Sequence, residues 1–377
     1  MAETTVRGQE RLHLDYIDGF RAIAALYVVC VHLLPRSWGE NSPVGPLRLL
    51  AKVLSQGHFA VTAFIVVSGF CLMLPVIRGG MTLRGGTTVF FKRRFWRIAP
   101  PFYLAFVASA LLLQLGKGLG AAVPAYYPTT QVTAAQVLGH LTLLQTLIPG
   151  GTLPNNGVLW SITVECLIYL WFPLLVLLWR RLGATRATVF YVAAGYAFFL
   201  ALRQTPLAPV TPQYLGAFAI GALAASIAYA PVGRWLEWRG RLPWHLIAFG
   251  IFGAIAGLCI LAGWEHVLPY LDWLDLPIAL SAAALLIGAS LPGKNRVRQA
   301  LQWKPLVALG AFSFSLYMIH YPLADIICRY LIEPLHLGQY AFAAAILVFA
   351  IPLILIASYG FYHAFERPFH AVAKRIV

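Results

Sequence analysis

Two ionisable side chains interrupt the first long apolar run of the chain, residues 14–35. Arg21 and His32 lie eleven positions apart, so at about 100° per residue a helix brings them to nearly the same face, roughly 16 Å apart along its axis. Ionisable groups inside a membrane are costly and are usually retained for function. The pair offers a positive charge for an anion and an imidazole that can act as a general base. The alternative is a snorkelling arginine and a core histidine bonded to a carbonyl.

Two other apolar runs carry polar residues spaced for one helix face. In the run 157–179, Glu165 has Ser161 four positions before it and Tyr169 four positions after it. In the run 306–330, the stripe at i, i+4 and i+7 consists of Ser313, Tyr317 and His320. A carboxylate in a membrane must pair, become protonated or meet water, so Glu165 is a candidate for binding or catalysis. Hydrogen bonds between packed helices, and a core role for the histidine, explain the same spacing.

A dense group of cations lies just before the third apolar run. Residues 78–97 hold six of them, and Lys92, Arg93, Arg94 and Arg97 stand beside two aromatic residues. Guanidinium groups pair bidentately with phosphate and also stack on bases. The group therefore suits a ligand with several phosphates and a base, such as coenzyme A. The alternative is a cluster that binds anionic lipid headgroups.

The composition is that of a membrane protein. The 377 residues are 60% hydrophobic and 11% charged, with a mean hydropathy of +0.75, values far from those of an ordinary soluble domain. The net charge of +15 does not indicate nucleic acid, because no recognition motif or soluble basic domain accompanies it. All five cysteines fall inside apolar runs, so we expect neither a disulfide framework nor a metal site.

Ten runs are long enough to cross a hydrocarbon core of about 30 Å as helices. They cover residues 14–35, 57–77, 98–116, 157–179, 187–203, 212–230, 243–263, 274–292, 306–330 and 339–363. The sequence therefore predicts an all-α, polytopic membrane protein with about ten transmembrane helices. Because no internal repeat or linker is evident, we expect a single domain over residues 1–377, with no appended soluble domain.

The distribution of Lys and Arg predicts the orientation. With the N-terminus inside, 21 of the 28 Lys and Arg residues fall in inner segments, as expected because cytoplasmic loops accumulate these residues. Both termini are then cytoplasmic. Counting about 1.5 Å per residue from the predicted helix ends places His32, Glu165 and His320 at one depth, roughly 20 Å above the inner edge.

The longest outer segment, residues 117–156, is almost uncharged. Its residues 131–147 have the pattern of an amphipathic helix that lies in the membrane interface. We expect this helix to shape an acceptor cleft, with His140 as an interfacial residue rather than a ligand.

Five segments, taken in order, resemble one family. They are Asp18-Gly19-Phe20-Arg21 with His32 eleven residues after the arginine, then residues 64–70, 93–100, 159–165 and 312–322. This order resembles the acyltransferase-3 family of integral membrane O-acyltransferases, from residue 14 to about residue 370. Members often carry a soluble esterase-like domain after the membrane part, which we do not expect here.

The resemblance implies acyl transfer from a thioester to an alcohol. His32 is then the base or, equally compatible with the sequence, a nucleophile that forms an acyl-histidine. Glu165 orients the imidazole or holds the acceptor, and Arg21 binds the pantetheine or phosphate end of the donor. The expected donor is acetyl-CoA or another short-chain acyl-CoA, bound by Arg93, Arg94 and Arg97, which match the family's basic motif, with Lys92 beside them. The expected substrate-binding residues are Asp18, Ser161, Tyr169, Ser313, Tyr317 and His320.

The acceptor that the resemblance implies is a sugar hydroxyl in a surface polysaccharide or a lipid-linked glycan. A secreted small natural product such as a macrolide is the alternative. A proton-coupled transporter or flippase is an alternative of another class, since such carriers also hold ionisable groups at mid-membrane. We expect a multi-pass protein of a bacterial inner or plasma membrane, with acyl-CoA, the acceptor and lipids as partners, and no nucleic acid.

Overall fold

The computed structural model describes residues 14–39, 41–54, 57–118, 132–293 and 295–376. In these ranges the chain forms helices and no strand, which confirms the all-α prediction. Residues 119–131, part of the predicted outer segment, lie outside the description.

Nine helical stretches of the described chain are long and apolar enough to cross a membrane. Their main helices are α1 (Asp15–Leu33), α3 (His58–Arg78), α4 (Gly86–Gly118), α6 (Trp160–Leu182), α7 (Ala184–Leu202), α8 (Tyr214–Tyr229), α10 (Trp244–Ala262), α12 (Leu271–Ser290) and, joined by π-helical turns, α16 (Gln339–Ala345), α17 (Ile351–Phe361) and α18 (Arg367–Arg375). A tenth span is bent by 73° between α14 (Lys304–Ala311) and α15 (Ser313–Ile327). The predicted ten runs correspond to these stretches in order.

The predicted start of the third helix is wrong. The sequence placed it near residue 98, with the cations in the preceding loop, but α4 begins at Gly86 and continues through Pro100 and Pro101. A membrane helix accommodates proline because neighbouring groups satisfy the freed backbone carbonyls. The basic cluster therefore lies on a rigid helix, which turns successive cations to different faces.

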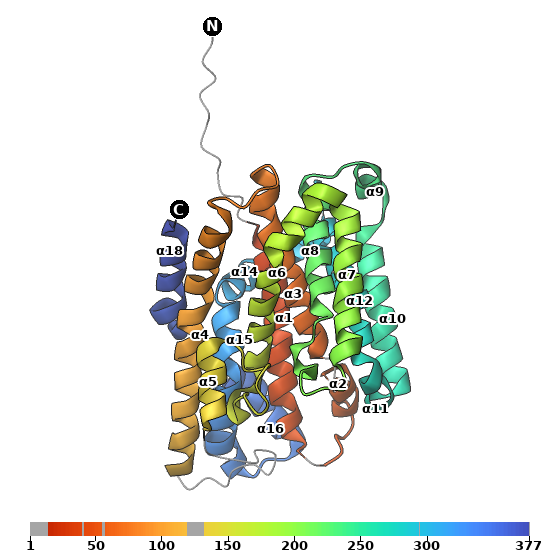
Figure 1. The fold of residues 1–377 in the computed structure, drawn as a ribbon. Helices are drawn as coiled ribbons and strands as arrows, with labels where there is room; N and C mark the ends of the chain where they lie inside the picture. The colour runs from red at the N-terminus through yellow and green to blue at the C-terminus, as the bar shows by residue number, and fades with distance from the viewer. Residues whose placement is uncertain (1–13, 40, 55–56, 119–131, 294, 377) are drawn as a thin grey trace.

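The helices form one bundle with two distinct ends (Figure 1). α1 and α3 run through the middle, α4 and α18 lie on one flank, and α7, α10 and α12 on the other. The chain enters α1 and leaves α18 at the same end, which also carries α9 (Arg234–Arg241). We call this the basic end, because most of the Lys and Arg residues lie in the segments at this end. The short helices α2 (Leu47–Leu54), α5 (Ala134–Thr142) and α11 (Trp264–Val267) lie at the opposite end.

The backbones of α3 and α8 touch at two glycines. A Cβ at Gly221 would lie 2.0 Å from the carbonyl oxygen of Val66, and one at Gly69 would lie 2.0 Å from that of Phe218. Small residues permit such contact, which is a common way for helices to associate in membranes. The crossing fixes α3, and α3 forms one wall of the cavity described below.

Helix α5 occupies the middle of the predicted amphipathic segment. A capping box between Thr133 and Gln136 starts it, as this motif satisfies two free donors at a helix N-terminus. The prediction for His140 is wrong, because its side chain is fully buried and its ring centroid lies 4.6 Å from that of Phe106. Burial lowers the pKa of His140, so this histidine is a neutral packing residue.

Candidate active site

An open cavity lies between α1, α3, α4, α6 and α15. The polar side chains of its wall are those of Arg21, Ser68, Arg94, Arg97, Ser161, Glu165, Tyr169, Ser313 and Tyr317. Along α3 the lining extends from Val61 to Leu72, which is about 16 Å at 1.5 Å per residue. The cavity is thus long in the direction of the bundle axis, and eight of the predicted site residues meet in it.

Three arginines gather toward the basic end of this cavity. Arg94 and Arg97, one turn apart on α4, face Arg21 of α1. The Arg94 guanidinium carbon lies 5.9 Å from the ring centroid of Tyr169, and its buried Nε has no hydrogen-bond partner. An unpaired buried donor is costly unless a ligand satisfies it. Arg21 keeps a carboxylate, that of Asp18, at 3.7 Å.

The other two cations predicted to bind the donor point elsewhere. Arg93 donates from Nε and Nη2 to the carbonyl oxygen of Ile376, at 2.9 and 2.8 Å, and ties α4 to the end of α18. Lys92 is exposed. Neither residue is among those that line the cavity, nor is Asp18. The prediction that all four cations act together on one ligand does not match this geometry, because consecutive residues of a helix point about 100° apart.

Glu165 is held in the middle of the cavity by two hydroxyl groups. Ser68 of α3 donates to Oε1 at 2.8 Å, and the Tyr169 hydroxyl donates to the same oxygen. Donors of this kind satisfy a buried carboxylate. Because both bonds go to Oε1, the second oxygen keeps its capacity to accept from a ligand. Sequence reasoning missed Ser68, although the residue lies in a segment that carried the family resemblance.

A second hydroxyl pair lies further toward the opposite end. The Tyr317 hydroxyl is 2.7 Å from Ser161 Oγ and 3.1 Å from the carbonyl oxygen of Val158. Asn156, fully buried just before α6, donates to Ser109 Oγ and to the carbonyl oxygen of Met318. These bonds join α6 to α15 and fix the position of Tyr317. The predicted spacing of Ser161 with Glu165, and of Tyr317 with Ser313, thus places all four side chains on the cavity wall.

His32 and His320 are bonded to each other. His32 Nδ1 lies 3.0 Å from His320 Nε2, and the two rings stack with centroids 5.1 Å apart. His320 Nδ1 faces two backbone carbonyl oxygens, those of Leu316 at 3.1 Å and Tyr317 at 2.8 Å. Carbonyls only accept, so His320 carries its proton on Nδ1 and accepts on Nε2. His32 then donates from Nδ1, and its Nε2 holds the free lone pair of a base.

The histidine pair adjoins the cavity without lining it. Tyr317 lies at the boundary, since its side chain lines the cavity and its ring centroid is 6.0 Å from that of His320. His320 was predicted to contact substrate, but in the structure it is fully buried behind His32. Its position suits a residue that orients the imidazole of His32.

The predicted common depth holds for the two histidines and fails for Glu165. Ser161 and Tyr317 are level, because their hydroxyls are bonded. From that level Glu165 lies four residues toward the basic end and His320 three residues the other way, which separates them by about 10 Å along the axis. The sequence count assumed that the fourth apolar run starts at the membrane edge, whereas Asn156 is already buried in the bundle.

One hydrogen-bonded carboxylate and one ion pair outside the cavity hold these helices. The carboxylate of Glu366 accepts from the backbone N–H and the hydroxyl of Ser315, at 3.1 and 2.5 Å, at the bent start of α15. At the other end of α1, Arg36 pairs with Asp325 of α15 at 3.2 Å. Sequence reasoning missed both contacts. The only signal was a carboxylate inside an apolar run at Asp325, and one just after the last run at Glu366.

The fold and the site define a multi-pass membrane protein whose helices enclose an arginine-lined cavity next to a histidine pair. The model of the acyltransferase-3 family, described as an acyltransferase domain, matches residues 14–363. The chain belongs to this family, and it is a membrane O-acyltransferase.

Named relatives support the same activity. Acyltransferase MdmB of Streptomyces mycarofaciens is 25% identical over 324 residues, covering 82% of this chain and 79% of the relative. Nodulation protein 10 of Rhizobium leguminosarum bv. viciae is 30% identical over 250 residues, covering 62% and 65%. O-acetyltransferase OatA of Staphylococcus aureus is 22% identical over 345 residues, covering 85% of this chain and 52% of the relative. The chain thus spans about half of OatA. No solved structure matches the chain.

Proposed function

We propose that this O-acyltransferase moves an acetyl or other short acyl group from cytoplasmic acyl-CoA to a hydroxyl of a sugar in a surface polysaccharide or a lipid-linked glycan. The observation that carries this proposal is the cavity, which places three arginines at its basic end and hydroxyl groups and a histidine pair toward its other end. A donor with phosphates at one end and a thioester at the other suits such a polarity.

Arg94, Arg97 and Arg21 would bind the phosphates of the donor. Guanidinium groups form bidentate, charge-assisted bonds with phosphate, and the unpaired Nε of Arg94 gains a partner. Between this group and Tyr317 the lining combines the apolar side chains of Val67, Ile65 and Phe64 on α3 with the polar group around Glu165. A flexible, mostly uncharged arm such as pantetheine fits a lining of this kind.

His32 would act on the acceptor hydroxyl. Its Nε2 takes the proton as the hydroxyl oxygen attacks the thioester carbonyl, because a neutral alcohol is a poor nucleophile. The C–S bond of the tetrahedral intermediate then breaks, and the imidazolium returns the proton to the leaving thiolate. His320 accepts from His32 Nδ1 throughout and keeps the ring in the productive tautomer.

The oxyanion of the tetrahedral intermediate and the bound substrates also need polar partners. The cavity wall offers the hydroxyls of Ser161 and Tyr317 and the carboxylate of Glu165. The hydroxyls of Ser161 and Tyr317 lie on the cavity wall beside the histidine pair, and a hydroxyl that turns away from the Val158 carbonyl would donate to a developing oxyanion and stabilise it. Glu165 lies about 10 Å from His320 along the bundle axis, toward the basic end. It is therefore better placed to accept from the donor arm or from an acceptor hydroxyl than to orient His32.

The experiment is a transfer assay with detergent-purified protein and labelled acetyl-CoA. The acceptors are polysaccharide fragments, a lipid-linked sugar and a macrolide, and His32→Ala is the inactive control. Label on a sugar hydroxyl supports the proposal. Label only on the macrolide would replace the sugar acceptor by a small natural product.

We further place the protein in the inner or plasma membrane of a bacterium, with the basic end and both termini in the cytoplasm. The support is the excess of Lys and Arg in the segments of that end, since cytoplasmic loops accumulate these residues.

A further inference from the structure

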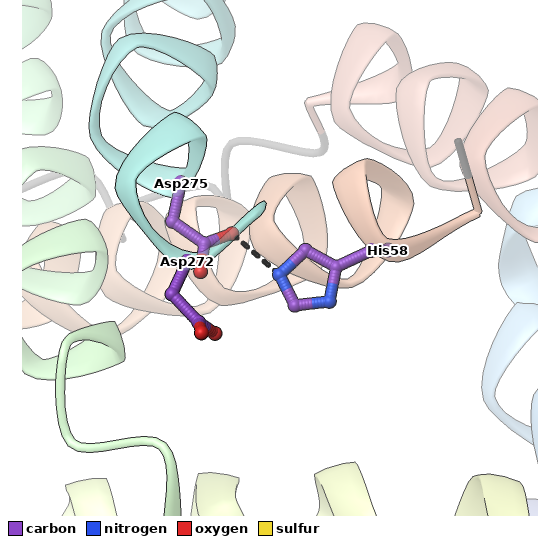
Figure 2. A group of neighbouring side chains, drawn as sticks. All are labelled: His58, Asp272 and Asp275. Carbon is purple, nitrogen blue, oxygen red and sulfur yellow. Dashed lines mark ion pairs between the residues drawn. The ribbon is translucent and has the colours of Figure 1, made fainter. Parts of the chain in front are cut away.

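A second polar cluster lies away from the cavity, where the N-terminal ends of three helices meet. His58 is the first residue of α3, Gln213 immediately precedes α8, and Asp272 and Asp275 lie in the first turns of α12. Figure 2 shows the imidazole of His58 directed at a carboxylate oxygen of Asp275, with Asp272 beside them. One ligand atom from each of His58, Asp272 and Asp275 lies within 4.8 Å of the others. None of the three lines the cavity.

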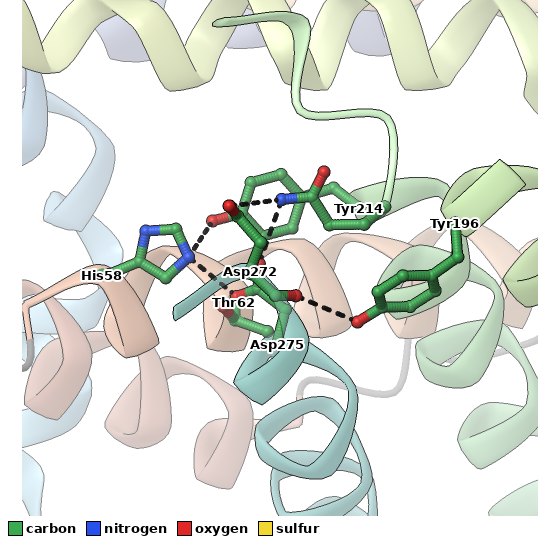
Figure 3. A network of polar contacts seen from close by, with 7 residues as sticks. His58, Thr62, Tyr196, Tyr214, Asp272 and Asp275 are labelled. Atoms are coloured by element: carbon green, nitrogen blue, oxygen red, sulfur yellow. Dashed lines mark hydrogen bonds and ion pairs between the residues drawn. The ribbon is translucent and has the colours of Figure 1, made fainter. Parts of the chain in front are cut away.

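The cluster is built into the bundle. His58 Nε2 lies 2.9 Å from Asp275 Oδ1, and the side chain of Asp275 is 1% exposed. Thr62 donates to the same oxygen at 2.5 Å, and the Tyr214 hydroxyl is 3.1 Å from His58 Nε2 (Figure 3). The side chain of His58 is 16% exposed and Asp272 is half-buried, so an ion can enter from that side.

Gln213 has an unpaired amide oxygen next to the cluster. Its side chain is 1% exposed, and Nε2 donates to Asp272 Oδ1 at 2.9 Å and to Asp275 Oδ2 at 3.3 Å. Its Oε1 is buried and has no partner, which is costly for an amide oxygen. Half a turn of the amide would direct Oε1 at both carboxylates. Without a cation, the amide oxygen and the two carboxylates would repel one another. Around a cation, the same three groups would all be favourable ligands.

We propose that His58, Asp272 and Asp275 bind a divalent cation of the zinc type, with Gln213 Oε1 or a water as the fourth ligand. One imidazole nitrogen with two carboxylate oxygens is a donor set typical of Zn²⁺, whereas Mg²⁺ and Ca²⁺ prefer oxygen alone. At about 2.0–2.1 Å per bond, tetrahedral ligand atoms lie about 3.3 Å apart. The ligand atoms of His58 and Asp275 are 2.9 Å apart, and all three lie within 4.8 Å of one another, so small side-chain movements would reach that value.

Charge and position agree with this site. With His58 neutral as a ligand, two carboxylates balance one dication. The ion would join α3, α8 and α12 at their ends, and so it would act as a clamp between helices rather than in acyl transfer. The sequence predicts no metal, because His58 and the aspartates are more than 200 positions apart and no short motif connects them.

The test is zinc binding by the full-length protein in detergent after treatment with a chelator. We expect one zinc ion per chain at micromolar free zinc, and a higher thermal midpoint when zinc is added. His58→Gln and Asp272→Asn should each weaken binding at least tenfold. His336→Gln, which changes an exposed histidine outside the cluster, is the matched control and should bind as the wild type.

Wild-type protein that binds no zinc would overturn the proposal, whatever the variants do. So would variants that bind zinc as tightly as the wild type, or variants that lower the thermal midpoint while zinc leaves the wild-type midpoint unchanged. The last result would make the cluster a hydrogen-bonded ion pair alone. His32→Ala should leave zinc binding intact, so this test is independent of the proposed transfer reaction.

Discussion

The bond from His32 to His320 decides which nitrogen of His32 is free to react. Two carbonyl oxygens hold the proton of His320 on Nδ1, so its Nε2 accepts and His32 presents Nε2 as a base. A histidine whose tautomer is fixed in this way is ready to take a proton without reorganisation. In the proposed reaction, the buried His320 would therefore act through His32 as a positioning residue.

His32→Ala should lower transfer by at least about a hundredfold, since a general base contributes roughly 10²–10⁴-fold. His320→Ala should lower kcat by about tenfold or more, which corresponds to about 1.4 kcal/mol in the transition state. His320→Gln should retain more activity than His320→Ala, because an amide oxygen can accept from His32 Nδ1. The measurement is kcat and KM for the acceptor with each variant.

A change confined to the acceptor KM in His320→Ala would instead restore the role in substrate binding that the sequence suggested. Spacing alone could predict that His32 and His320 each face the bundle interior. It could not predict that the two rings touch, because the contact joins residues 288 positions apart in the chain. The same holds for Ser68 and Glu165.

The four cations near the start of helix α4 point in different directions. The sequence treats Lys92, Arg93, Arg94 and Arg97 as one basic segment, but the helix directs only Arg94 and Arg97 into the cavity. The prediction failed at the helix boundary, since the two prolines resemble a helix start and lie in the middle of α4. Hydropathy, by contrast, was enough to find the ten apolar stretches.

Arg94→Ala and Arg97→Ala should each raise the KM for acetyl-CoA by roughly tenfold or more, because a lost hydrogen bond to a charged group costs about 1.5–3 kcal/mol. Lys92→Ala, two residues before Arg94 and exposed, should leave that KM unchanged. Steady-state kinetics with varied donor and saturating acceptor make the comparison. Equal donor KM in all three variants, with weaker binding to anionic liposomes, would assign the cluster to lipid headgroups.

The contact of α3 with α8 gives a test of the fold. Gly221→Ala places a methyl group 2.0 Å from the carbonyl oxygen of Val66, so the helices must move apart. Overpacking of this kind typically costs about 1–3 kcal/mol, and the shift also disturbs Ser68, two residues beyond Val66. We expect a lower thermal midpoint and weaker transfer. Gly253→Ala on α10, where no atom lies within 4 Å of the added carbon, should change neither property.

At the scale of the whole molecule, the cavity is polarised along the bundle axis. Arginines gather at the end where the chain enters α1, and the histidine pair lies beyond Tyr317 toward the other end. The axial lining of about 16 Å, obtained from helix rise, is comparable to the length of an extended pantetheine arm. Under the proposed function, donor and acceptor would therefore approach the same reacting atoms from opposite faces of the membrane.

Reconstituted vesicles should consume acetyl-CoA at the face that carries the basic end and acylate an impermeant acceptor at the opposite face. The vesicles are first treated with protease, so that intact protein remains in only one orientation. Labelled donor is then supplied on one side of the membrane at a time. Acylation of acceptor only on the side of the donor would contradict the through-membrane route. It would leave the chain an O-acyltransferase.

The position of Tyr317 has a consequence for the cell. A membrane that stores energy as a proton gradient cannot contain an open polar passage from one face to the other. The hydroxyl of Tyr317 is bonded to Ser161 and Val158, and its ring contacts Phe64 with centroids 5.9 Å apart. These bonds place a bulky side chain between the arginine-lined space and the histidine pair. Under the proposed through-membrane route, Tyr317 would close this passage to protons between turnovers, and its ring would have to turn aside for the thioester to reach His32.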